Sequence, residues 1–220
     1  MQETIDGQDT PKKMNTWLTI WVKPKETIRY AIEHKTLLMA FLIVSIAGIG
    51  NGLDAAFGNS PGEVIPTWAI LLLCVLGGPI YGLITLYVTS GIYYLVGKWF
   101  GGKGTMRDMQ MAVSWSMIPL IWTMLVWVID FSLFGTSVFK EEFANDVGVG
   151  GWIIFFIGKL LEVTASVWAI VISIFGIAEA HKLSGGKAFL TWFLPGLVIG
   201  GVIVLVVIFI VVATVGASQL

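Results

Sequence analysis

Five apolar runs of membrane-spanning length constrain the fold of this chain more than any other feature of its sequence. A helix needs about 20 apolar residues to cross the hydrocarbon core of a bilayer. Hydrophobic residues make up 56% of the chain and charged residues only 12%, whereas soluble domains have about 25% charged residues. The sequence therefore predicts an all-α integral membrane protein that folds as a single five-span helical bundle. The expected spans are residues 37–57, 67–96, 109–134, 150–178 and 189–215.

Basic residues are distributed unevenly around these spans. Eleven of the 13 lysines and arginines lie before the first span, after the second or after the fourth. The loops on the opposite side hold only Lys140, next to several acidic residues. Because loops rich in Lys and Arg stay in the cytoplasm, we expect a cytoplasmic N-terminus. An odd number of spans then places the C-terminus outside.

The segment before the first span has two parts. Residues 1–13 are polar, and we expect a disordered tail there. Residues 14–36 resemble an amphipathic helix at the membrane interface, broken or restarted at Pro24. Trp17 and Trp21 lie one helical turn apart on this segment. It either anchors the first span or contacts lipid headgroups or a protein partner.

Two glycine-containing turns, "FGGKGT" at 100–105 and "HKLSGGK" at 181–187, lie on the predicted cytoplasmic side. The first lacks the spacing of a nucleotide-binding P-loop and follows a predicted membrane helix rather than a strand. Thr105 is a suitable N-cap, with Asp108 three positions on. Basic side chains of these turns either are solvated or contact headgroups or a partner. The candidate headgroup or partner contacts are the two tryptophans of the N-terminal segment and the side chains of, and next to, these turns: Trp17, Trp21, Lys98, Lys103, Arg107, His181, Lys182 and Lys187.

Four charged residues fall inside the predicted spans. Lys159 and Glu162 are three apart in the fourth span, and Asp54 and Asp130 lie near the outer ends of the first and third. An unpaired charge at the bilayer centre costs about 2.5–3.5 kcal/mol, so such side chains face the bundle interior or snorkel. With Ser166 on the same helix face, they form either an ion-pair network, in which Lys159 meets Glu162 or Asp130, or an outward-facing polar cavity.

Glycines and prolines mark packing faces and helix breaks within the spans. Pro79, beside Gly77 and Gly78, predicts a kink or break in the long second span, and Pro119 predicts one in the third. Small residues four apart let helix backbones approach closely. Such glycine pairs are Gly48 and Gly52, Gly78 and Gly82, and Gly196 and Gly200.

Residues that carry catalysis or bind metals are sparse. The chain has two histidines, His34 and His181, and one cysteine, Cys74, all far apart in the sequence. Neither G-x-S-x-G nor H-E-x-x-H occurs. Because no Lys/Arg stripe is present, we expect no nucleic-acid binding. The sequence therefore predicts a protein without enzymatic activity, cofactor or metal.

Four stretches carry a resemblance to a known family. They are "WVKPKETIRYAIE" before the first span, "GGPIYG" in the second, "WFGGKGTMRDMQMAVSWSMIP" between the second and third, and "GIAEAHKLSGGKAF" between the fourth and fifth. With the five spans, they resemble the Yip domain family of Ypt/Rab-interacting proteins, in a bacterial form. The resemblance covers about residues 17–210.

The resemblance implies a five-helix bundle with a cytoplasmic N-terminal region. Eukaryotic members are linked to prenylated Rab GTPases, vesicle traffic and membrane shaping, but the short N-terminal segment here carries no evident GTPase-docking motif. We therefore expect a non-enzymatic scaffold or adaptor in a bacterial cytoplasmic membrane, with lipid or protein partners and with homo-oligomers left open. The alternative is a channel or transporter that moves ions, solutes or lipids through a cavity lined by Lys159, Glu162 and Asp130.

Overall fold

A computed structural model describes residues 14–140, 143 and 147–217, all of them helical or in connecting segments. The tail expected at residues 1–13 lies outside the described residues. The helices are α1 (Thr16–Thr19), α2 (Pro24–His34), α3 (Leu37–Asn59), α4 (Thr67–Trp99), α5 (Met106–Ser116), α6 (Ile118–Trp122), α7 (Met124–Phe134), α9 (Val149–His181) and α10 (Gly185–Ala217), with short 3-10 helices η1 (Pro61–Glu63) and η2 (Gly135–Phe139).

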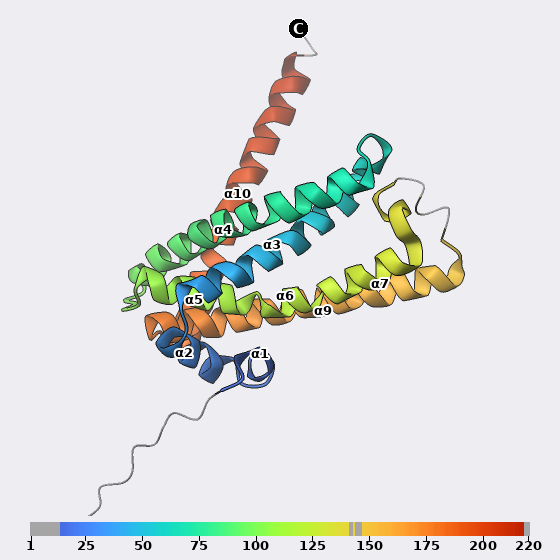
Figure 1. Cartoon of the computed structure of the whole chain (residues 1–220). Coiled ribbons are helices and arrows are strands. Elements are labelled where there is room, and N and C mark those ends of the chain that lie inside the picture. The colour runs from blue at the N-terminus through green and yellow to red at the C-terminus, as the bar shows by residue number, and fades with distance from the viewer. Residues whose placement is uncertain (1–13, 141–142, 144–146, 218–220) are drawn as a thin grey trace, which may run out of the picture.

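Five helical segments are long and apolar enough to cross a membrane. The predicted all-α membrane fold is therefore confirmed. Four of the segments pack together in two layers, with α3 and α4 in one and the α5–α6–α7 segment and α9 in the other (Figure 1). The five segments are Leu37–Asn59, Thr67–Trp99, Met106–Phe139, Val149–His181 and Gly185–Val211.

Glycines explain how closely α3 and α4 approach. A Cβ atom added at Gly48 would overlap the backbone of Gly78, and one added at Gly82 would overlap the carbonyl group of Val44. In a membrane, helices associate through such backbone proximity because lipid tails are as apolar as the side chains. The small residues of the α3–α4 interface thus hold the upper layer together.

The two intramembrane prolines have different effects. The third span is divided between α5 and α6 at Met117, and Pro119 is the second residue of α6. In contrast, α4 continues without a break through Gly77, Gly78 and Pro79, so a break there is wrong, and the expected kink stays a prediction. A proline removes only one backbone donor. Gly78 and Gly82 pack against α3, so α3 supports α4 around Pro79 and the helix continues.

The N-terminal segment folds as two helices, α1 and α2, and α2 begins at Pro24, where a break or restart was expected. Pro24 opens α2, where its missing N–H costs nothing because that donor has no partner in a first turn. Ile28 and Ala31 of α2 are fully buried, and α2 packs on α5 and α9. Its apolar face therefore contacts the bundle rather than lipid.

The last helix, α10, leaves the bundle (Figure 1). Ala188 and Thr191 near its start are fully buried, and this part packs on α9 and α4. Beyond Pro195 every residue through Val211 is exposed. Gly196 and Gly200 have no other helix within reach of an added Cβ. The second half of α10 is therefore covered by lipid or by another membrane chain when the protein lies in a bilayer.

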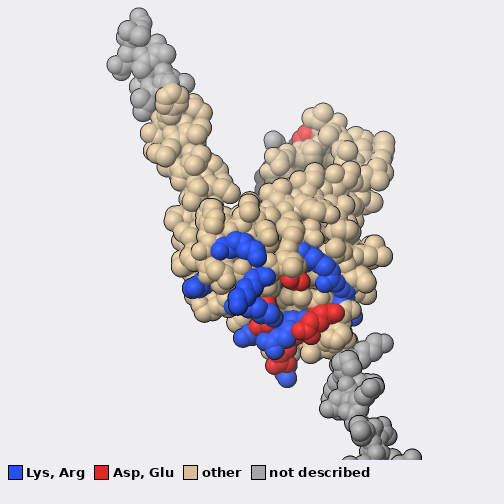
Figure 2. Space-filling model, turned by 90° about the vertical axis from the view of Figure 1, so that its left-hand side faces the viewer, with Lys and Arg blue, Asp and Glu red and all other residues tan. Residues whose placement is uncertain are grey.

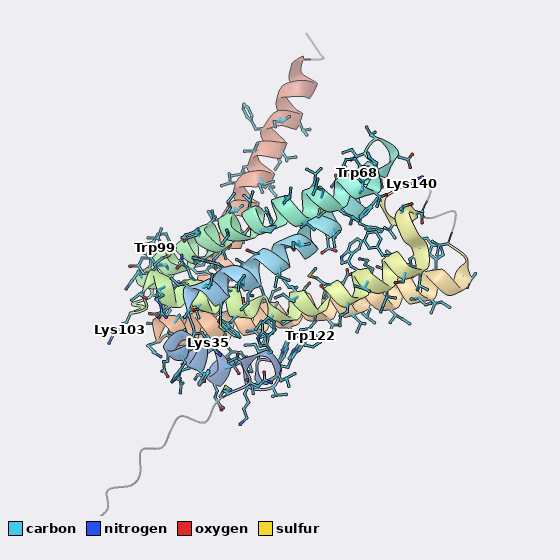
Figure 3. All side chains as sticks on the ribbon, viewed as in Figure 1. Lys35, Trp68, Trp99, Lys103, Trp122 and Lys140 are labelled. Atoms are coloured by element: carbon cyan, nitrogen blue, oxygen red, sulfur yellow. The ribbon has the colours of Figure 1, made fainter. Side chains whose placement is uncertain are left out.

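Charged and aromatic residues distinguish the two ends of the bundle. Lys35, Trp99 and Lys103 lie at one end, and Trp68 and Lys140 at the other (Figure 3). The first end, called here the basic end, carries a cluster of Lys and Arg side chains (Figure 2), and the opposite end is called the far end. Because Trp68 and Trp99 are both exposed, their positions suit the two membrane interfaces, where tryptophan is enriched.

Candidate functional site

Lys159 and Glu162 form an ion pair inside the bundle. The Lys159 Nζ donates to Glu162 Oε2 at 2.7 Å, and the two side chains are only 26% and 17% exposed. Residues three apart on a helix lie on one face, so α9 alone brings this pair together. Of the pairings left open by the sequence, the structure places Lys159 with Glu162.

Three aromatic rings surround the Lys159 ammonium group. Its Nζ lies 5.2 Å from the ring centroid of Phe57, 5.1 Å from that of Trp127 and 5.4 Å from that of Phe155. These rings come from α3, α7 and α9 and belong to an aromatic cluster in the far half of the bundle. A cation over ring faces is stabilised by the ring quadrupole, and more strongly where water is excluded.

Carboxylates outnumber cations around this ammonium group. Asp54 accepts a hydrogen bond of 3.0 Å from Trp127 Nε1. Asp130, on α7, is only 2% exposed, and its carboxyl group is within electrostatic range of Lys159. Glu162 in turn interacts electrostatically with both Asp54 and Asp130. Three carboxyl groups therefore share one lysine, and the cluster has an acidic excess.

A polar cavity of about 240 Å³ lies beside this cluster, between α3, α6 and α9. Its polar lining comes from Asn51, Asp54, Thr123, Glu162 and Ser166. Lys159 and Asp130, expected to line the cavity, are not among its lining residues. Asn51 and Thr123 were missed because an isolated amide or hydroxyl in an apolar run is usually a packing residue.

The cavity presents hydrogen-bond acceptors. The Ser166 hydroxyl donates to the Glu162 carbonyl at 2.9 Å, and the Thr123 hydroxyl donates to the Leu120 carbonyl at 2.7 Å. Each hydroxyl oxygen therefore has only lone pairs left for a ligand. The buried Oε1 of Glu162 has no hydrogen-bond partner among the described residues. The arrangement thus favours a ligand that is cationic and donates hydrogen bonds.

At the basic end, Glu179 joins α2 to α9. Arg29 donates to it twice, from Nε to Oε2 at 2.8 Å and from a terminal nitrogen to Oε1 at 3.1 Å. Lys25 and Lys182 lie 3.5 and 3.7 Å from the same carboxylate. This hydrogen bonding raises the pKa of Arg29 above its ordinary value. The sequence analysis missed Glu179, whose only signal was an acid within a basic turn.

His181, expected among the headgroup contacts, is fully buried, and that expectation is wrong. Its Nε2–H donates to the Tyr93 carbonyl at 3.2 Å, because a carbonyl can only accept. Its Nδ1 accepts from the Gly104 N–H at 3.3 Å, which fixes the neutral tautomer. The ring fills space that a Cβ at Gly97 or Gly102 would occupy. The glycine-rich turn is therefore shaped around this imidazole.

The other predicted contacts remain at the surface of the basic end, where Figure 2 shows a cluster of cations. Lys98 lies 5.2 Å over the ring of Tyr94, and Lys187 donates to the Phe100 carbonyl at 3.1 Å. Trp17 is 40% exposed, and Trp21 is half-buried. Lys103 and Lys182 are exposed. These positions are compatible with headgroup contacts and leave that role as a prediction.

The family model of the Yip1 domain matches residues 18–214. The chain belongs to the Yip1 domain family. The match runs from α1 into the last turns of α10, so both the cavity and the basic end lie within the Yip1 domain. No curated protein and no solved structure matches the chain. The predicted family is confirmed, and the roles of individual residues rest on the geometry alone.

Proposed function

We propose that this Yip1 domain is a non-enzymatic membrane protein that binds a primary ammonium group in its acidic cavity and thereby organises lipid around itself. The observation that carries this proposal is a cavity lined by hydrogen-bond acceptors. The carboxyl groups in and around this cavity outnumber Lys159, the nearby cation. Burying excess negative charge is costly unless a cation or protons accompany it. An ammonium group supplies both the charge and the hydrogen-bond donors.

The chemistry of the cavity supports an organic cation rather than a metal ion. Among residues 14–140, 143 and 147–217, no group of three or more His, Cys, Asp or Glu side chains could hold a metal. Asp54 and Glu162 approach the cavity from different helices, and Asn51, Thr123 and Ser166 add neutral oxygens. A tetrahedral ammonium group can use such dispersed acceptors one at a time.

The way the cavity opens supports a lipid as the source of that group. Asn51, Asp54 and Ser166 are exposed at the bundle surface between α3 and α9. Between the cavity and the basic end, these helices bury apolar side chains, among them Ile43, Ile118 and Ile172. A ligand would therefore enter sideways from the bilayer and meet an apolar floor. Transport of ions or solutes across the membrane is the alternative.

Lipid retention tests the proposal. The protein, purified in maltoside micelles, is incubated with phosphatidylethanolamine, phosphatidylcholine or phosphatidylglycerol, and bound lipid is counted by native mass spectrometry. We expect preferential retention of phosphatidylethanolamine, since the quaternary ammonium group of phosphatidylcholine has no N–H donor. Asp54→Asn should reduce this retention about tenfold, as expected for one charged hydrogen bond. Glu26→Gln, at an exposed carboxylate on α2, is the matched control.

Four results would contradict the proposal. Equal retention of the three lipids by the wild-type protein, or unchanged retention by Asp54→Asn, would mean that the cavity does not select an ammonium group. A flux of methylammonium or potassium ions into proteoliposomes, abolished by Asp54→Asn, would replace lipid binding by transport. Retention of soluble ethylamine without retention of the lipid would identify a soluble amine as the ligand.

A further inference from the structure

A second polar pocket lies at the basic end, far from the acidic cavity. Its volume is about 360 Å³, and it is formed by the start of α1, the entrance to α3 and the end of α5. Asn15 and Trp17 line it from the N-terminal segment, Lys35 and Met39 from the start of the first span, and Trp115 from α5. Three segments distant in the sequence thus meet around one space.

The indole N–H of Trp115 is a buried donor without a partner. Trp115 is only 1% exposed, and its Nε1 has no hydrogen-bond acceptor among the described residues. Leaving a buried donor unpaired costs about 1–3 kcal/mol, so tryptophans in protein interiors usually find an acceptor. Trp115 lines the pocket, and its N–H, which neighbouring atoms cover, would have to turn toward the pocket to meet an acceptor atom of a ligand.

Positive charge at the pocket is not neutralised by carboxylates of the described residues. Lys35 is half-buried, and its ammonium group lies 5.8 Å over the Tyr30 ring. The ion pairs among the described residues do not include Lys35. The Arg107 guanidinium lies close by, donating to the carbonyls of Ile32 and Lys35 at 3.2 and 3.0 Å. Glu179, the buried acid of this end, already has three cationic partners.

One side of the pocket lies at the entrance to the first spanning segment. Lys35 lies two residues before Leu37, where the first spanning helix begins. Trp17 and Leu18 beside it are 40% and 60% exposed, as expected for side chains immersed in the interfacial layer. In a bilayer, the Lys35 side of the pocket would therefore face the headgroup region.

We propose that this pocket binds the phosphate group of an anionic lipid. Lys35 supplies the charge, the Trp115 indole N–H donates a hydrogen bond to a phosphate oxygen, and Trp17 covers the bound group. A charged hydrogen bond in a partly buried site is about twice as strong as a neutral one. The inference is independent of the proposed function, since the two pockets share no lining residue and differ in the sign of their charge.

The indole N–H of Trp115 is a direct reporter of this site. The full chain, labelled with ¹⁵N-tryptophan in maltoside micelles, gives one indole cross-peak for each tryptophan, and Trp115→Phe identifies that of Trp115. The probes are dioctanoyl phosphatidic acid, inorganic phosphate and dioctanoylglycerol. We expect phosphatidic acid to move the Trp115 cross-peak downfield as the hydrogen bond forms, and dioctanoylglycerol to leave it in place.

Variants separate the charge at Lys35 from the charge of the whole basic end. Lys35→Gln should weaken phosphatidic acid binding at least about tenfold, the loss expected for one charged hydrogen bond. Lys23→Gln, which removes an exposed cation of the same N-terminal segment, should leave the binding unchanged. Lys35→Arg should retain most of it. If Trp115→Phe does not fold, the peak that moves in the wild type and not in Lys35→Gln serves as the reporter.

Each outcome decides between the alternatives. A shift with phosphatidic acid but not with inorganic phosphate supports a lipid headgroup, and a shift with both supports a phosphate site open to soluble anions. An unmoved Trp115 cross-peak, equal binding by Lys35→Gln, or a shift with dioctanoylglycerol would overturn the proposal, because occupancy would then require neither the phosphate nor the lysine.

Discussion

Arg29 and Glu179 form a two-pronged hydrogen-bonded ion pair, with distances of 2.8 and 3.1 Å, although 150 positions separate them in the sequence. The pair joins α2, which precedes all the spans, to the last turn of α9. Ile28 and Ala31 of α2 are buried beside it. The N-terminal segment is therefore a packed part of the Yip1 domain, and its position depends on a side chain of the fourth span.

Glu179→Gln should loosen this attachment. The Glu179 side chain is 6% exposed and neutralises three cations, so we expect a loss of about 2 kcal/mol in the free energy of unfolding, typical of hydrogen bonds to charged groups. Hydrogen exchange should accelerate in residues 24–34 first. The control is Glu26→Gln, whose exposed pair with Lys23 at 3.7 Å should contribute almost nothing. Equal protection in both variants would refute the role of Glu179.

Lys159→Met should destabilise the protein more than the replacement of both Lys159 and Glu162. Removing the lysine leaves the acidic excess of Asp54, Asp130 and Glu162 without its cation, and breaking a buried pair on one side costs about 3–5 kcal/mol. Lys159→Met combined with Glu162→Gln should recover part of that loss, since the charge it leaves behind is smaller. Thermal unfolding of both variants in micelles measures the difference. Additive losses would mean that the two side chains do not interact.

Sequence patterns predicted the apolar spans, the family and several local features, because each of these depends on residues that lie close together in the sequence. The capping box of α5 is an example: Thr105 and Asp108 bond to each other's backbone N–H groups at 2.9 and 3.2 Å. The pairing of Lys159 with Glu162 also follows from spacing along one helix. Both features could be derived without knowing which helices are neighbours.

The remaining features depend on contacts between distant segments. The burial of His181 requires the turn at 100–105 to fold over it, and the role of Glu179 requires α2 to pack on α9. The unbroken α4 at Pro79 depends on the glycine contact with α3. Asn51 and Thr123 become cavity residues only because α3 and α6 meet there. A single sequence carries no record of these neighbours.

Two adjacent glycines of α4 provide a matched test of the α3–α4 interface. A Cβ at Gly78 would overlap the backbone of Ile49, whereas a Cβ at Gly77 would meet nothing within 4 Å. Gly78→Ala should therefore destabilise the protein by about 1–3 kcal/mol through overpacking. Gly77→Ala should be neutral or stabilising by up to about 1 kcal/mol, because alanine favours the helix. Similar midpoints of thermal unfolding for the two variants would contradict this packing.

Substitutions in the glycine-rich turn at 100–105 should destabilise the protein where they disturb the contact with His181, and not where they only remove a charge. A Cβ at Gly104 would overlap the carbonyl group of Ala180, and one at Gly102 would overlap the His181 ring. Gly102→Ala should therefore displace the imidazole and cost about 1–3 kcal/mol of stability, measured by thermal unfolding in micelles. Gly185→Ala, at the open start of α10, is the control and should be neutral.

Lys103→Gln, in the turn at 100–105, should also be neutral, because the Lys103 side chain is exposed. Of the groups of Lys103, only the backbone N–H, bonded to the His181 carbonyl at 2.9 Å, holds the turn in place. If Lys103→Gln proved more harmful than Gly102→Ala, the turn would act through its charge, as a phosphate-binding loop does, and not as the cover of a buried histidine.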